Sequence, residues 1–118
     1  MQIYMTTGLN KRIAEDSEFA RFMADSSGKF RVRDWGDLCD EDKELNDWAL
    51  KHMSGRIVAR YNHSNGVDNI YFIATYMSTG VQLEVMFCDE YWLSEHTLKG
   101  MLFFYIESFR WQPSENSL

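Results

Sequence analysis

The alternation of apolar and polar positions between residues 56 and 87 predicts three β-strands. In the first and third segments apolar side chains recur at every second position: Ile57, Ala59 and Tyr61, then Val81, Leu83, Val85 and Phe87. Residues 70–77 (IYFIATYM) are apolar on both faces, which is typical of a central strand. Asn65-Gly66 and Ser78-Thr79-Gly80 separate the segments with turn-forming residues. We therefore predict an antiparallel three-stranded meander.

The N-terminal third predicts a short strand followed by helix. Residues 2–6 have the pattern of a strand, and the apolar positions of residues 10–24 suit one or two short helices. Ser17 is a candidate helix cap inside this stretch. Ser26-Ser27-Gly28 is expected to end the helical part, with residues 30–33 following as a short strand or extended segment.

Two further segments have the pattern of helices. Residues 40–52 form the clearer one, because Asp40 can cap its start and Gly55 follows its end. Its expected buried stripe is Leu45, Trp48, Ala49 and Met53. Residues 95–111 carry a continuous apolar stripe at helical spacing: Leu98, Met101, Leu102, Tyr105, Ile106 and Phe109. Residues 112–118 are expected to form a flexible tail.

Together these elements predict a single α+β domain over residues 1–111. In it, an antiparallel sheet of three to four strands packs against N-terminal helices and a C-terminal amphipathic helix. A chain of 118 residues, 45% of them apolar and 15% aromatic, can bury a core without cross-links. No basic stretch leads into an apolar run at the N-terminus, and the longest apolar run, residues 101–106, is too short to span a bilayer. We therefore expect a cytoplasmic protein with reduced cysteines and no membrane contact.

The sequence contains no clear catalytic or metal-binding motif. The histidines, His52, His63 and His96, do not fall at the spacing of known metal or nucleophile motifs. Cys39 precedes a helix N-terminus, which favours a thiolate, but the neighbouring carboxylates would repel that charge. The acids that follow Asp34 do not match a calcium-binding loop. We therefore expect no enzyme, no catalytic residue, no metal and no cofactor.

The negative charge of the chain is concentrated in one segment. The net charge of −6 argues against an ordinary duplex-binding protein, which needs a basic face to neutralise phosphates. Residues 34–47 hold seven acids and one lysine, a local net charge of −6, whereas the other residues balance eleven acids with eleven bases. A helix start whose acids favour the dipole and face water would explain this segment. This is the commoner explanation of such a charge run. The alternative is a patch that meets a basic surface of a partner, and its candidate residues are Asp34, Trp35, Asp37, Asp40, Glu41, Glu44 and Asp47.

Trp35 has two possible roles next to these acids. An exposed tryptophan is the kind of aromatic anchor that is enriched at interface hot spots. A buried tryptophan would instead fix the loop before the helix, and this is the commoner role. The sequence favours the core role without excluding the anchor.

Three stretches carry a resemblance to other proteins. They are the opening MTTGLN with IAED and FARF, the block DWGDLCDEDKE with ND and AL, and the segment GRI with Ala59 and Tyr61. They resemble a family of small proteins from bacterial plasmids, conjugative elements and prophages that has no agreed enzymatic function. The resemblance covers residues 5–91 and is strong as far as Tyr61. The sequence departs from the family pattern between Met23 and Asp34, and residues 95–111 extend beyond the shorter relatives.

The resemblance implies a role in countering host defence. Some similar small proteins are associated with inhibition of CRISPR nucleases. We therefore expect an anti-CRISPR-like inhibitor whose acidic helix meets the nucleic-acid-binding surface of a host Cas nuclease or another such defence protein, without binding nucleic acid itself. The alternative is a self-associating or regulatory protein of a phage or plasmid with no nuclease target, for which a homodimer is possible.

Overall fold

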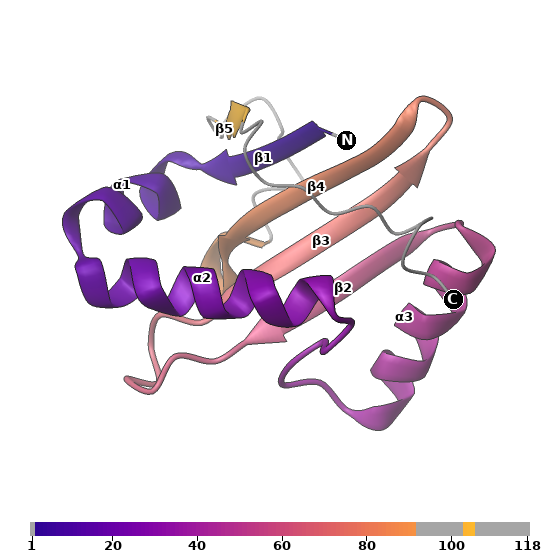
Figure 1. The fold of residues 1–118 in the computed structure, drawn as a ribbon, viewed down its shortest axis with the longest axis horizontal. Helices are drawn as coiled ribbons and strands as arrows, with labels where there is room; N and C mark the ends of the chain where they lie inside the picture. Colours follow the sequence, from indigo (N-terminus) through magenta and orange to yellow (C-terminus); the bar gives the residue numbers. More distant parts are fainter. Residues whose placement is uncertain (1, 92–102, 106–118) are drawn as a thin grey trace.

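The structure of the protein is a computed structural model, and it describes residues 2–91 and 103–105 (Figure 1). Along the chain the elements are β1 (Gln2–Thr6), α1 (Thr7–Glu15), α2 (Ser17–Arg31), α3 (Asp40–His52), β2 (Arg56–Tyr61), β3 (Ile70–Met77), β4 (Gly80–Phe87), the short 3-10 helix η1 (Cys88–Glu90) and β5 (Phe103–Tyr105). This is the α+β class that the sequence predicts. In Figure 1, α2 crosses one face of the sheet, and α3 lies beside the strand β2.

The strands form one sheet in the order β2-β3-β4-β1-β5. The predicted meander is confirmed, because β3 pairs antiparallel with both β2 and β4. The sheet as a whole is mixed rather than antiparallel, since β1 runs parallel to β4 with Ile3 opposite Leu83. A parallel pair requires a crossover connection instead of a hairpin, and here the chain between β1 and β4 includes three helices and two strands. The local pattern of residues 2–6 predicts the strand but carries no information about this distant neighbour.

The hydrophobic core joins the sheet to α2. The strands contribute side chains from alternate positions, among them Ile3, Met5, Ile57, Ala59, Ile70, Phe72, Leu83 and Val85. Helix α2 contributes Phe19, Met23 and Phe30, all of which are buried. Burying an apolar side chain of this size contributes about 1.5–3 kcal/mol relative to exposing it. Packing against the sheet therefore holds α2 in place.

A carboxylate, not the predicted serine, caps the start of α2. Oδ1 of Asp16 accepts hydrogen bonds from the backbone N–H groups of Glu18 and Phe19, each at 3.1 Å. Ser17 is the first residue of the helix itself. Both residue types are favoured at helix caps, and one position separates the predicted cap from the observed one.

Helix α2 also continues further than predicted. It passes through Ser26-Ser27-Gly28 and ends at Arg31, so the predicted extended segment at residues 30–33 is wrong. Its inward residues are Phe19, Met23, Ser26 and Phe30, which follow one another at intervals of four, three and four. Phe30 is fully buried, and the burial of this ring outweighs the weak helix preference of serine and glycine.

The predicted C-terminal helix over residues 95–111 and the predicted tail over residues 112–118 lie mostly outside the described residues. Within this part of the chain, β5 pairs antiparallel with β1, so these three residues form a strand where a helix was predicted. Consecutive aromatic residues favour a strand, and β1 provides an edge with which the strand can pair.

Candidate functional site

The loop between α2 and α3 closes the outer edge of β2. The carbonyl oxygen of Trp35 accepts a hydrogen bond from the N–H of Arg60 at 3.1 Å, and the N–H of Asp37 donates to the carbonyl oxygen of Arg60 at 2.7 Å. This arrangement makes a single parallel bridge between Gly36 and Arg60. The distinctive WGD sequence therefore acts as a short substitute for a neighbouring strand.

The acidic side chains of this loop are used within the protein. Oδ1 of Asp34 accepts from the N–H of Gly36 at 3.1 Å, and Oδ2 of Asp37 accepts from the N–H of Asn62 at 2.9 Å. The hydroxyl of Tyr61 donates to the carbonyl oxygen of Asp34 at 2.7 Å. Burial, with a smaller contribution from the Asp34 charge, raises the pKa of Tyr61, so its hydroxyl stays protonated and continues to donate.

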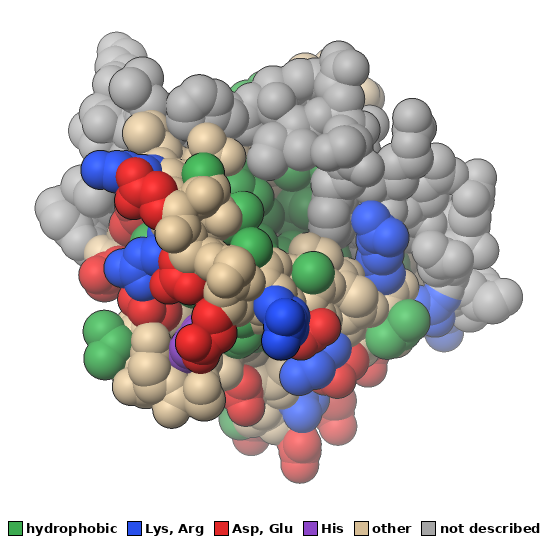
Figure 2. Space-filling view, turned by 60° about the vertical axis from the view of Figure 1, so that its left-hand side comes forward, with side chains coloured by type: hydrophobic (Ala, Val, Ile, Leu, Met, Phe, Trp, Pro, Cys, Tyr) green, Lys and Arg blue, Asp and Glu red, His purple; other side chains and the backbone are tan. Residues whose placement is uncertain are grey.

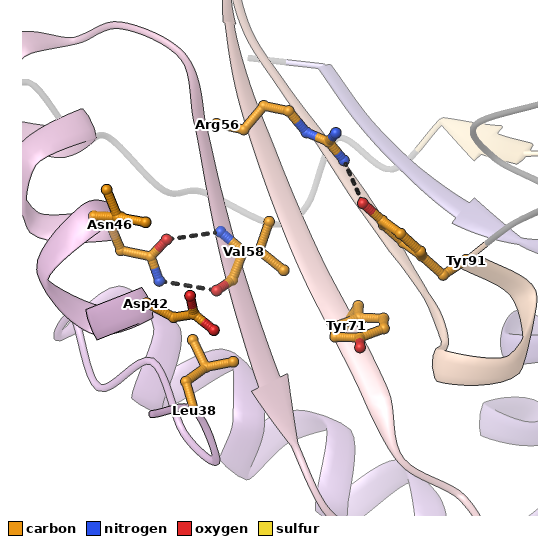
Figure 3. A pocket seen from close by; sticks show the side chains of 8 residues that line it. Leu38, Asp42, Asn46, Arg56, Val58, Tyr71 and Tyr91 are labelled. Atoms are coloured by element: carbon orange, nitrogen blue, oxygen red, sulfur yellow. Dashed lines mark hydrogen bonds between the residues drawn. The ribbon is translucent and has the colours of Figure 1, made fainter. Parts of the chain in front are cut away.

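Asn46 of α3 completes the closure of this edge (Figure 3). Its side-chain amide donates to the carbonyl oxygen of Val58 at 2.8 Å and accepts from the N–H of the same residue at 3.1 Å. The outward backbone groups of Val58 and Arg60 and the N–H of Asn62 thus all have partners within the protein. An edge strand with unpaired groups is a template for aggregation, and this edge is blocked.

Trp35 has the core role and not the anchor role. Its side chain is only 3% exposed, and its ring meets that of Phe30 edge-on with centroids 5.5 Å apart. Its Nε1–H donates to Oδ1 of Asp47 at 2.9 Å. Asp47, predicted to face a partner, therefore uses its carboxylate to hold this tryptophan.

Helix α3 begins and ends at the predicted residues, but its N-cap residue is Cys39 and not the predicted Asp40. Ala49 is buried as predicted, and the rest of the buried face differs from the prediction. The buried residues of α3 are Asn46, Ala49 and Leu50. Leu45 and Trp48, expected in the buried stripe, are 65% and 57% exposed, and Met53 is 52% exposed. The two hydrogen bonds between Asn46 and Val58 turn the amide of Asn46 inward, and this rotates the helix away from the orientation that its apolar residues predict.

The result is an exposed tryptophan surrounded by acids. At about 100° per residue, Glu41, Glu44 and Trp48 lie within about 60° of one another around α3, and Asp40 adjoins them. All four are exposed, and the carboxylates of the three acids form no hydrogen bond or ion pair with another described residue. The ring of Trp48 packs against that of His52, with centroids 4.4 Å apart. We call Asp40, Glu41, Glu44 and Trp48 the α3 face.

The seven predicted partner-binding residues therefore fall into two groups. Asp34, Trp35, Asp37 and Asp47 hold the loop and the sheet edge, whereas Asp40, Glu41 and Glu44 belong to the α3 face. Sequence reasoning missed Trp48, which it placed in the core. The signal that could have found it is its spacing of four and seven residues from Glu44 and Glu41, which puts it in the middle of the charged face.

A pocket of about 350 Å³ adjoins the α3 face, between α3 and the sheet (Figure 3). Its walls include Leu38, Asp42, Leu45, Val58, Tyr71 and Tyr91. Arg56 reaches the rim, where its guanidinium lies 3.5 Å from the hydroxyl oxygen of Tyr91. We call this cavity the α3 pocket.

Cys88 does not have the properties of an activated nucleophile. Both cysteines are free thiols, with Cys39 exposed and Cys88 half-buried. Burial raises the pKa of the Cys88 thiol to about 11, so this thiol is protonated near neutral pH, the reverse of what a nucleophile needs. Within residues 2–91 and 103–105, no group of three or more His, Cys, Asp or Glu side chains could hold a metal ion.

No protein-family model matches the chain, and searches of curated proteins and of solved structures found no similar protein. In the described part of the chain, every helix is too short or too polar to cross a membrane.

Proposed function

We propose that the protein is a non-enzymatic binding protein of the bacterial cytoplasm that uses the α3 face to dock on a basic surface of a partner protein. The observation that carries this proposal is the exposed Trp48 beside acids that lack counterions among the described residues. Tryptophans are enriched among the residues that dominate binding energy. Surrounding carboxylates speed association with a basic partner and disfavour acidic ones.

The charge spacing of the α3 face suits a surface that normally holds nucleic acid. Asp40, Glu41 and Glu44 lie along about 6 Å of helix, and duplex DNA carries one negative charge per roughly 1.7 Å. The α3 face therefore matches the charge density of DNA over only a few base pairs. This length is enough to block one basic cleft. The side of the molecule in Figure 2, toward α1, instead has acidic and basic side chains interspersed.

The kind of partner follows from the resemblance to plasmid and prophage proteins. We propose an anti-CRISPR-like inhibitor that binds a host Cas nuclease, or another nucleic-acid-binding defence protein, where phosphates would otherwise bind. The protein itself binds no nucleic acid, since its net charge of −6 repels phosphates.

The test is a DNA-cleavage assay with a Cas nuclease and guide from the host. Wild-type protein is expected to reduce cleavage, and the double variant Glu41→Lys, Glu44→Lys is expected to lose this effect. The control is Glu15→Lys, Asp25→Lys, which makes the same change in net charge at exposed residues of α1 and α2. Inhibition that survives in the α3 variant, or is lost equally in the control, would contradict the proposal.

Self-association is the second candidate, because Leu45 and Trp48 place exposed apolar surface on α3. Two copies meeting through this face would bring like charges together, which costs energy, so we favour the basic partner. Light scattering distinguishes the two: a dimer that Trp48→Ala converts to a monomer would support self-association.

A further inference from the structure

We infer that the α3 pocket is a subsite for an arginine side chain of the basic partner, an inference that rests on the proposed function. The pocket and the α3 face belong to one continuous surface. Around the helix, Leu45 lies about 40° from Glu41, and Asp42 lies about 60° beyond Leu45. Because Leu45 is exposed and also lines the pocket, a partner that covers the α3 face reaches the pocket across it.

Asp42 supplies the negative charge of the pocket lining, and this residue is exposed. The carboxylate of Asp42 is directed into the cavity in Figure 3, and it has no hydrogen-bond or ion-pair partner among the described residues. Arg56, the one cationic residue among the described residues of the lining, points away from Asp42 toward Tyr91. The guanidinium carbon of Arg56 lies 6.0 Å from the centroid of the Tyr91 ring.

The charge of Arg56 also acts on Glu84 of β4. Burial raises the pKa of Glu84, and both the hydrogen bond from Gln82 and the charge of Arg56 oppose that rise.

The shape and composition of the pocket select a long cationic side chain. Leu38, Leu45 and Val58 form an apolar wall that suits an aliphatic stem. Asp42 suits a cationic head, and a planar guanidinium can bind a carboxylate through two hydrogen bonds at once. Tyr71 adds an aromatic surface, to which arginine is well suited. An anionic ligand would be repelled by Asp42, and a neutral one would leave its charge unpaired.

The experiment is an NMR titration of the full chain with N-acetyl-L-arginine methylamide. The matched probe is N-acetyl-L-citrulline methylamide, which has nearly the same shape and no charge. We expect saturable shifts of the backbone amides of Leu38, Asp42, Leu45 and Val58 with the arginine probe. Binding should weaken at least about tenfold, or about 1.4 kcal/mol, in Asp42→Asn, and remain unchanged in the control Asp25→Asn.

Three results would overturn the inference: shifts that do not saturate, equal binding of the citrulline probe, or unchanged affinity in a folded Asp42→Asn variant. The titration requires no partner protein, so its outcome is independent of the cleavage assay. If the pocket binds the arginine probe but the Glu41→Lys, Glu44→Lys variant still inhibits cleavage, the proposed function alone is refuted. If the α3 face is needed for inhibition but the arginine probe does not bind, only the inference about the α3 pocket is refuted.

Discussion

Asn46 satisfies both backbone hydrogen-bonding groups of Val58, donating to its carbonyl oxygen at 2.8 Å and accepting from its N–H at 3.1 Å. One side chain thus attaches α3 to the edge of the sheet and sets the rotation of the helix. The α3 face is exposed because this amide, and not the apolar Leu45 and Trp48, is turned inward.

Replacing Asn46 should therefore destabilise the protein. Asn46→Ala removes two hydrogen bonds and leaves the groups of Val58 without their partner, at a cost of about 2–3 kcal/mol. Urea denaturation measures this change. The control Asn62→Ala removes an exposed side-chain contact to Arg60 and should cost less than about 0.5 kcal/mol. Equal effects of the two substitutions would contradict the role assigned to Asn46.

Gly36 should tolerate no side chain. Its φ is +80°, and a Cβ there would collide with the carbonyl oxygen of Arg60 and lie 2.7 Å from the ring of Tyr61. We expect Gly36→Ala to cost more than about 3 kcal/mol. Gly55 has a similar φ of +83° and open space around it, so Gly55→Ala should cost only about 1–2 kcal/mol, from backbone strain. Thermal denaturation of both variants measures the difference: the melting temperature should fall more for Gly36→Ala, which adds a steric collision, than for Gly55→Ala, which adds backbone strain alone.

Gly28→Ala should stabilise the protein, in contrast to the substitutions at Gly36 and Gly55. Gly28 lies inside α2, and a Cβ there would meet no atom within 4 Å. Alanine reduces the entropy of the unfolded chain, so the free energy of unfolding should rise by about 0.5–1 kcal/mol. A lower midpoint in urea would show that α2 does not continue through this position.

Asp68 should make stability depend on pH in the acidic range. Burial acts to raise its pKa, but hydrogen bonds from Asn65 and Arg12 and the nearby positive charges outweigh burial and lower the pKa below 3.8. The ion pair with Arg12, at 2.7 Å, then stabilises the folded state above the unfolded pKa, and this contribution is lost as pH falls through the folded value. Because Arg12 is partly exposed, the contribution should be below about 1 kcal/mol. In Asp68→Asn the free energy of unfolding should therefore fall less between pH 6 and pH 2 than in the wild type. Urea denaturation across this pH range measures the difference.

Local patterns were sufficient to predict the meander and the ends of α3. The alternation in β2 and β4 and the apolar run of β3 reflect burial that each strand experiences by itself. The parallel pairing of β1 with β4 depends instead on residues about 80 positions apart, and the pattern of one strand does not record its distant neighbour.

The candidate site was predicted in part: Trp35 is in the core, the role that the sequence favours, whereas Trp48, predicted to be buried, is exposed. Trp35 is in the core because the WGD loop joins the edge of β2, which brings the indole N–H to Asp47. Trp48 is exposed because Asn46 takes the inward position. A prediction from helical spacing places a polar asparagine on the exposed side. For α3 this predicts the wrong rotation about the helix axis. Only the long-range contact of Asn46 with Val58 reveals that Trp48 is exposed.

The most direct test of the α3 face is the concentration of Trp48→Ala needed for half-maximal inhibition in the cleavage assay. Trp48 is 57% exposed, so its truncation should leave the melting temperature nearly unchanged. The account predicts that this concentration rises by at least about tenfold, as for loss of an interface hot spot. Val67→Ala, a control at another exposed apolar residue, should leave it unchanged. A folded Trp48→Ala variant that inhibits as strongly as the wild type would contradict the account.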